Sequence, residues 1–393
     1  MRPVIYTSRV GNLANQMIQY MAALRIAADL ENCQIADVNL PEWKIAFPPE
    51  HVDPERTLQV HSIMNGVRTN DITRLGLSDL IKSGQYDNLG IFTYAQHMAN
   101  FLSPDFYREV FQSGLDVEGF GSDKIVINIR GNEILSGIHP EYVLLPIEYY
   151  QDIVKSTGLK PVFLGQIDDS PYMRRLMAEF PAAEYRSTQG ALIDFETLRR
   201  SSHIVVAIST FSWLAAWLSH ADSVYLPLSG LFNPFQYPAI NLLPLNDKRY
   251  HFDLFPINYA VPVVRYQQIH TSLRAQWRRM SAEMMQQLLR DYPRYGYDQS
   301  KMFSHFDENY YLSSNPDVRQ AVEAGTFQSG RQHFEKTGHL EGRGAFPLDP
   351  EWYCLNYTMA ALEVGQGDYL NLHSHYLEIG RSRGYKNVPP ELK

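Results

Sequence analysis

The sequence predicts an α/β protein with two parallel-sheet halves and a smaller helical tail. Three observations predict this class: short β-branched runs alternate with helical patterns up to about residue 260, the alternation restarts near residue 123, and an internal repeat begins near residue 303. Strands separated by helices are typical of βαβ units, whose strands pair in parallel. A chain of 393 residues also exceeds one ordinary core, since domains usually run about 100–200 residues.

The first half, residues 1–122, begins with a strand and a buried helix. Val4 to Ser8 reads as the strand. Apolar residues recur at helical spacing directly after Gly11, at Leu13, Met17, Tyr20, Met21 and Leu24. We therefore expect a helix to start immediately after this first strand.

The second half, residues 123–300, repeats this alternation of strands and helices. Its predicted strands are residues 124–130, 162–164, 203–206 and 223–226. Residues 272–290 are predicted to form one helix that closes this half, with Trp277, Met280, Met284 and Leu288 on one stripe. Packing on the α/β body is favoured over a membrane-surface helix.

The tail, residues 301–393, aligns with itself at a spacing of 42 residues. Four anchors share that spacing: residues 306–311 with 348–353, 333–334 with 375–376, Gly338 with Gly380, and Gly342 with Gly384. The tail is therefore predicted to contain two copies of a small aromatic-rich helical unit. A role in oligomerisation or as a scaffold is one alternative for it.

The net charge, the apolar pattern and the cysteines argue against several classes of function. The net charge is −8 at pH 7, so no basic excess exists to neutralise nucleic-acid phosphates. No run of about 18 apolar residues suggests a membrane span, and the start does not read as a secretory signal. Cys33 and Cys354 have no zinc-site spacing. The simplest interpretation is a cytoplasmic protein without a structural metal.

A glycine turn between the first strand and its helix is the first candidate site. Gly11 allows close backbone approach, and the helix start after Asn12 favours anionic or hydroxyl-rich ligands. The alternative is that Asn12 simply caps the helix.

A second candidate site follows the first strand of the second half. Alternation along that strand places Asn128 and Arg130 on one face and delivers Arg130 to the carboxyl end, where open α/β sheets bind ligands. A guanidinium there can bind a phosphate through two hydrogen bonds. The alternative is an ion pair with Asp168, Asp169 or Glu133.

A third candidate site again lies at a strand end that opens a helix. Ser209, Thr210 and Ser212 offer hydroxyls to phosphate oxygens, and Phe211 is placed to cover a ring. Asp168 and Asp194 could accept hydrogen bonds from a base or ribose, or act as ordinary helix caps.

Taken together, these segments resemble the fucosyltransferase superfamily of GT-B fold, and in particular the bacterial α-1,2-fucosyltransferases of glycosyltransferase family 11. Residues 11–20 resemble the opening GRLGNQLFQY of that group, residues 128–133 lie where it has HxRRGD, and residues 209–213 match its STFSWW. Residues 306–318 resemble FDxxYYLxxNPDV repeats that accompany bacterial glycosyltransferases.

The resemblance implies two Rossmann-like domains that face each other across a cleft, with the acceptor on the first. It implies an inverting, metal-independent transfer of a sugar, typically fucose from GDP-fucose, to a glycan or lipid-linked glycan in bacterial surface polysaccharide synthesis. Arg130 would neutralise the departing diphosphate, and Asn15 would lie near the transferred sugar. The implied donor contacts are Gly11, Asn12, Asn128, Arg130, Asp168, Asp194, Ser209, Thr210, Phe211 and Ser212.

The chain departs from this pattern at the second motif. Asn128 stands at its His, Gly131 at its second Arg, and Asn132 and Glu133 at its Gly-Asp. Glu133 is the leading candidate for the base that deprotonates the acceptor, with His139 and Glu141 as alternatives. The competing hypothesis is a non-catalytic nucleotide- or sugar-binding protein of the same fold. Peripheral contact with the inner face of the membrane and homo-oligomerisation through the repeats complete the expected partners.

Overall fold

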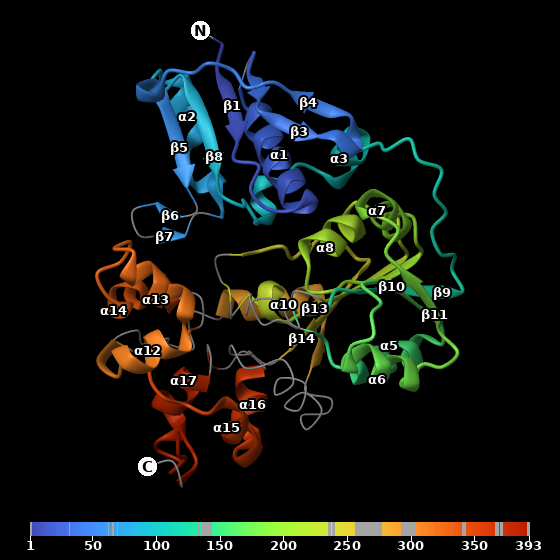
Figure 1. Cartoon of the computed structure of the whole chain (residues 1–393), viewed down its shortest axis with the longest axis vertical. Helices are drawn as coiled ribbons and strands as arrows, with labels where there is room; N and C mark the ends of the chain where they lie inside the picture. Colours follow the sequence, from blue (N-terminus) through green and yellow to red (C-terminus); the bar gives the residue numbers. More distant parts are fainter. Residues whose placement is uncertain are drawn as a thin grey trace.

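A computed structural model shows two parallel sheets with their helices, followed by a helical tail (Figure 1). We call the parts around the two sheets the first half and the second half. The described residues are 2–30, 32–61, 63–64, 67–68, 70–131, 134, 144–234, 237, 240–255, 277–291, 303–339, 343–365, 369 and 372–390.

The first half is built on a four-stranded parallel sheet in the order β2, β1, β8, β5. The strands are β1 (Val4–Thr7), β2 (Gln34–Ala36), β5 (Thr57–His61) and β8 (Asn88–Phe92). The helix expected after Gly11 is confirmed as α1 (Leu13–Ala27). Smaller elements complete this half: β3 (Val38–Leu40), η1 (Pro41–Trp43), β4 (Ile45–Phe47), η2 (Pro54–Arg56), β6 (Ile63–Met64), β7 (Val67–Arg68), η3 (Ile72–Leu75), α2 (Leu77–Lys82), η4 (Met98–Asn100) and α3 (Pro104–Val110).

The second half is built on a seven-stranded sheet in the order β11, β10, β9, β12, β13, β14, β15. Its strands are β9 (Lys124–Ile129), β10 (Lys160–Gly165), β11 (Glu184–Ser187), β12 (His203–Val205), β13 (Ser223–Leu228), β14 (Tyr250–Leu254) and β15 (Arg278–Met280). All pair in parallel except β14 with β15. Numbered within this half, the first six follow the 3-2-1-4-5-6 order of the doubly wound Rossmann sheet.

Helices cover both faces of the second sheet. They are α5 (Ile147–Thr157), α6 (Pro171–Glu179), α7 (Ala191–Arg199) and α8 (Thr210–Trp217), with η5 (Gly230–Phe232) after β13. In Figure 1, α7 and α8 lie on the side toward the first half, and α5 and α6 lie on the other. The central strand β9 is buried from Ile125 to Ile129, as expected for a parallel strand covered on both faces.

The two halves share an apolar core. Helix α1 contacts α8, and a single buried cluster joins Met17 and Tyr107 of the first half to Trp213 and Trp217 of the second. Backbone bonds add to this packing, because Met98 N–H donates to the Asn241 carbonyl at 2.7 Å. The halves are therefore in direct, well-packed contact along α8.

The prediction of one helix over residues 272–290 is wrong. Residues 278–280 form strand β15, and helix α10 (Ala282–Asp291) follows, while residues 272–276 lie outside the described residues. The side chain of Met284 is 39% exposed, whereas Met280 and Met285 are buried. The strand is favoured by a long-range ion pair, since Arg279 binds Asp253 of β14, which has no exposed surface.

The tail repeats the same elements twice. The first copy has α12 (Glu308–Ser314), α13 (Pro316–Glu323), α14 (Gly330–His333) and the π-helix η7 (Phe334–Gly338), and the second has α15 (Pro350–Asn356), α16 (Thr358–Gly365), α17 (Leu372–His375) and the π-helix η8 (Tyr376–Gly380). The predicted duplication is thus confirmed in the structure. Gly342 lies outside the described residues.

A tyrosine, a histidine and a glycine form the same contact in each copy. Tyr311 Oη lies 2.8 Å from His333 Nδ1, and the equivalent pair in the second copy lies 2.9 Å apart. A Cβ on Gly338 would come within 2.0 Å of the Tyr311 hydroxyl, and one on Gly380 within 2.2 Å of the Tyr353 hydroxyl. Glycine is therefore required at both positions, because the tyrosine hydroxyl packs directly against the backbone there.

Within the described parts of the chain, no helix combines the length and apolarity needed to cross a membrane.

Candidate functional site

Two neighbouring strand ends in the middle of the second sheet carry the candidate site. Arg130 follows β9, Ser209 follows β12, and these strands pair in parallel. The chain leaves β9 toward β10 on one side, and β12 leads to β13 on the other. Ligands of doubly wound sheets bind at the carboxyl ends of the strands where the order reverses in this way.

Arg130 and Ser209 are in contact at this point. Arg130 Nη1 donates to Ser209 Oγ at 2.9 Å. Ser209 is the N-cap of α8, because the same oxygen accepts the Phe211 backbone N–H at 3.2 Å. Since Oγ already accepts two hydrogen bonds, the hydroxyl proton remains suited to donation to a ligand oxygen.

The two described carboxylates offered as alternative partners of Arg130 are engaged elsewhere. Asp169 forms an ion pair with Arg174 at 3.0 Å, and Asp168 accepts the Ser170 backbone N–H at 3.0 Å. Both side chains are exposed. Asp168 therefore lies on the surface before α6, and its contact with a base or ribose stays a prediction.

Asn15 of α1 links the first half to this strand end. Its Oδ1 accepts from Thr210 Oγ1 at 3.0 Å and from Gln96 Nε2 at 3.2 Å. With two donors on the oxygen, the amide orientation is fixed and its NH₂ group remains for other acceptors. The first and third sequence motifs thus meet, as the resemblance implies.

The glycine turn before α1 is held by side chains of that helix. Gly11 has φ +86°, and a Cβ there would lie 2.7 Å from Asn15 Nδ2. Gln16 Nε2 donates to the Gly11 carbonyl at 2.8 Å, and the buried Gln19 donates to the Val10 carbonyl at 2.7 Å. The exposed Asn12 occupies the N-cap position, as the capping alternative expects, but its side chain forms no capping hydrogen bond.

Three residues expected at the donor contact the protein interior instead. Asn128 Nδ2 donates to the Leu164 carbonyl at 3.1 Å, and the Ser212 hydroxyl donates to the Ala207 carbonyl at 3.3 Å. Asp194 accepts the Gln189 backbone N–H at 3.0 Å and also the Thr188 hydroxyl. All three are buried, so the described geometry gives them supporting roles behind the site.

Phe211 is half-buried beside the site. Its ring meets Phe195 edge-on at 5.5 Å between centroids, and Phe195 meets Trp43 of the first half at 5.4 Å. This aromatic row packs the start of α8 against α7 and the first half. The exposed remainder of Phe211 can still contact a ligand ring.

His97 adjoins Gln96 at the junction of the halves. Its Nδ1 accepts the Ala99 backbone N–H at 3.2 Å and lies 3.8 Å from Asp71 Oδ2. Burial lowers the pKa of His97, and the nearby Asp71 carboxylate opposes this only in part. The imidazole is therefore neutral at pH 7.

The candidate bases Glu133, His139 and Glu141 lie outside the described residues. Among the residues that are described, no group of three or more His, Cys, Asp or Glu side chains could hold a metal ion.

Two glutamines near the site were not predicted from the sequence. Gln96 fixes the Asn15 amide from 81 residues away, and Gln166 Oε1 accepts the Gly131 backbone N–H at 2.6 Å, just after Arg130. Their partners are distant in sequence, so no local spacing marks them. The signal available was Gln166 itself, as a polar residue directly following β10.

No protein-family model matches this chain, and no curated protein matches it. Its function is therefore inferred from the geometry and chemistry of the site.

Proposed function

We propose that the chain is a glycosyltransferase of the fucosyltransferase superfamily with a GT-B fold. It would transfer a sugar from a nucleotide donor, most simply fucose from GDP-fucose, to a glycan or lipid-linked glycan of the bacterial surface. The main support is the meeting of Asn15, Arg130 and residues 209–210, which join through two hydrogen bonds at the strand-order reversal of the second sheet. The proposed setting is the cytoplasm or the inner face of the membrane.

The residues at the site match the chemistry of a departing diphosphate. As the acceptor hydroxyl attacks the sugar carbon, the bond to the nucleotide breaks and negative charge grows on the leaving phosphate. Arg130 supplies a positive charge, and Ser209 supplies a hydroxyl donor at the positive end of the α8 dipole. Thr210 donates its own hydroxyl proton to Asn15 and so orients that amide. Asn15 can donate from its amide to the sugar or a phosphate oxygen. Glu133 is the proposed base.

Removal of the Arg130 charge tests this assignment. Arg130→Ala should abolish most GDP binding by calorimetry and lower transfer or donor hydrolysis by about 10²–10³-fold, the usual loss for one preorganised charged contact. Arg186→Ala is the matched control, because Arg186 is an exposed arginine of β11 paired with Glu184. Unchanged binding of both GDP and UDP in Arg130→Ala would refute the assigned role.

One observation favours the non-catalytic alternative. Asn128, at the position of the motif's histidine, is buried and directed to the Leu164 carbonyl. If the purified protein binds a nucleotide sugar but neither hydrolyses nor transfers any of a panel of donors, the binding-protein hypothesis replaces the enzyme.

A further inference from the structure

A cavity lies at the opposite ends of the second sheet's strands from the candidate site. It is open to solvent, has a volume of about 430 Å³ and is lined by Arg108, Arg199, Arg200, Ser201, Ser202, Leu218 and His220. Residues 199–202 precede β12, and His220 precedes β13, so the cavity lies at the amino ends of these strands. The candidate site is at the carboxyl ends of the same strands. Helix α8 runs from one place to the other, and its 8 residues rise about 1.5 Å each.

Every ionisable residue that lines this cavity is basic. Arg199 and Arg200 both pair with Glu196, which has no exposed surface, so two positive charges share one buried carboxylate. Arg108 pairs with Asp105, whose side chain is 80% exposed, and such a pair is well screened by water. The cavity wall therefore carries net positive charge.

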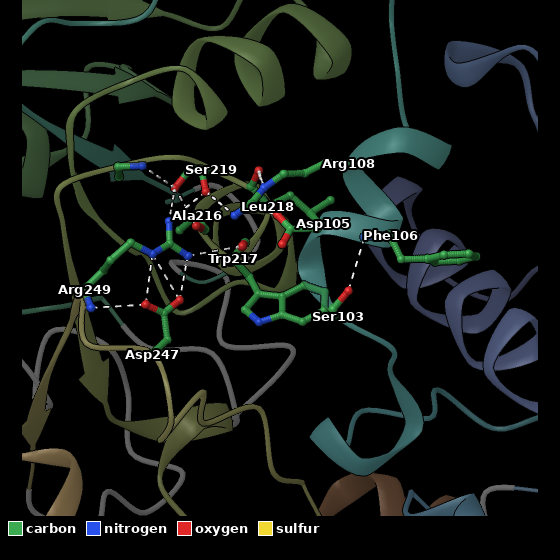
Figure 2. A network of polar contacts seen from close by, with 11 residues as sticks. Ser103, Asp105, Phe106, Arg108, Ala216, Trp217, Leu218, Ser219, Asp247 and Arg249 are labelled. Carbon is green, nitrogen blue, oxygen red and sulfur yellow. Dashed lines mark hydrogen bonds and ion pairs between the residues drawn. The ribbon is translucent and has the colours of Figure 1, made fainter.

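The three guanidinium groups are held in place by backbone carbonyls. Arg108 donates to the carbonyls of Leu218 and Ser219 at the end of α8, and Arg249 approaches the same turn from the opposite side (Figure 2). Arg199 donates to the Phe111 carbonyl at 2.7 Å, and Arg200 donates to the carbonyls of Val117 and Leu115 in the segment that joins the halves. These bonds leave further N–H groups on each arginine and fix the cations before any ligand arrives.

His220 and Ser202 are the polar groups of the cavity whose side chains form no hydrogen bond to the described residues. His220 is exposed, and no hydrogen bond to it is found among the described residues. Its pKa is lowered first by burial and then by the charges of Arg108 and Arg249, which agrees with a positive potential at this position. Ser202 is half-buried, and its hydroxyl has no side-chain hydrogen bond within the described structure.

We propose that this cavity binds a phosphoryl-bearing ligand, with Arg108, Arg199 and Arg200 as the charge and the Ser202 hydroxyl as an added donor. Fixed guanidinium groups are well suited to bidentate phosphate recognition. The phosphoryl group could come from a soluble metabolite or from a lipid headgroup. The inference does not depend on the proposed glycosyltransferase activity.

Calorimetry with inorganic pyrophosphate tests this site in the Arg130→Ala background, in which the candidate nucleotide site lacks its charge. Ser202→Asp places a negative charge in the cavity and should weaken binding at least about tenfold, whereas Ser83→Asp, the same change at an exposed serine after α2 and away from the cavity, should bind like the parent. Both variants leave the arginine contacts intact. Absence of binding in the parent, or equal binding in the two variants, would overturn the proposal.

Vesicles distinguish the two ligand sources. Cosedimentation with phosphatidylcholine vesicles containing phosphatidic acid, and not with phosphatidylcholine alone, would support a lipid headgroup if Ser202→Asp also abolishes it. Pyrophosphate binding without cosedimentation would support a soluble ligand. Cosedimentation that Ser202→Asp leaves unchanged would exclude the lipid source at this cavity.

Discussion

The amide of Asn15 has one orientation that suits its neighbours. Gln96 and Thr210 both donate to Oδ1, so a flipped amide would bring donor against donor. The oriented NH₂ group lies over Gly11, where a side chain would collide with it. Asn15 is therefore a preorganised donor, and Gln96 is its positioning residue.

Changing the donor on Gln96 should disturb this orientation. Gln96→Glu replaces the Nε2 donor by an oxygen that repels Asn15 Oδ1, and we expect nucleotide-sugar turnover to fall about tenfold or more. Thr210→Ser, which keeps the other donor, is the matched control and should stay near the parent rate. Steady-state kinetics with thermal unfolding as a folding check measures both. Equal turnover in the two variants would contradict the positioning role.

His373 in the second repeat is fully buried, and its Nε2 lies 2.8 Å from the Phe346 carbonyl. Burial lowers the pKa of His373 to about 4. The unfolded chain takes up this proton below about pH 6.5, whereas the folded chain resists until about pH 4. Stability from this group is thus complete above pH 6.5 and is lost as the pH falls toward 4.

His373→Gln should remove this part of the acid sensitivity, because an amide can still donate to Phe346 but does not titrate. Between pH 7 and 4 the free energy of unfolding of the parent should fall by about 3 kcal/mol more than that of the variant. Urea unfolding at several pH values measures the difference. A His373 ring that titrates near pH 6.5 by NMR would contradict the expected shift.

At the scale of elements, strands and helices that show local periodicity were predictable. Strands β1, β9 and β12 carry β-branched runs, β10 and β13 carry short apolar runs, and α1 carries a clear apolar stripe. The segment before α10 was misassigned because Trp277 and Met280 happen to continue the helical spacing of Met284 and Leu288, and only the latter two lie in α10. Its true state depends on Asp253, a partner 26 residues away, which no window of local sequence contains.

The pairing of Arg279 with Asp253 should therefore control the edge strand β15. Asp253 has no exposed surface and also accepts the Tyr149 hydroxyl at 2.9 Å. Burial raises the pKa of Asp253, and Arg279 opposes that rise. Loss of Arg279 would leave a buried carboxylate without its counter-charge, a change that usually costs about 3–5 kcal/mol.

Arg279→Met should lower the free energy of unfolding by roughly 3 kcal/mol near pH 7. Arg278→Met is the matched control, because Arg278 is the neighbouring exposed arginine of β15 and has no ion pair within the described part of the chain. It should change stability by less than about 0.5 kcal/mol. The penalty in Arg279→Met should shrink as the pH falls toward 4, since protonation removes the buried charge. A pH-independent loss would argue for lost packing instead.

At the scale of the whole molecule, three motifs from two sheets were expected to form one site, and Asn15, Arg130, Ser209 and Thr210 do meet. Other expected donor contacts do not face the site. Asn128 of β9 and Ser212 of α8 are buried in the protein interior. Their burial results from the packing of other elements against β9 and α8, which the local sequence does not show. The 195-residue separation between Asn15 and Thr210 likewise becomes a contact only through the packing of α1 on α8.

That packing makes the two halves mutually dependent. Trp217 of α8 is 3% exposed, and its ring lies 5.8 Å from Phe101 and 6.0 Å from Tyr107 of the first half. Leu89 of β8 is equally buried but belongs to a separate cluster within the first half. A cavity in the shared cluster should therefore destabilise both halves, whereas a cavity in the separate cluster should destabilise mainly the first half.

Trp217→Ala should cost about 3–5 kcal/mol and lower amide-exchange protection in β1 and β8 as well as in β9 and β12. Leu89→Ala, which leaves a smaller cavity in the separate cluster, should cost about 2–5 kcal/mol and reduce protection mainly in the first sheet. Hydrogen exchange followed by mass spectrometry resolves the two sheets. If Trp217→Ala loosens only β9 and β12, the halves behave as independent units and the site between Asn15 and Thr210 must form after each has folded alone.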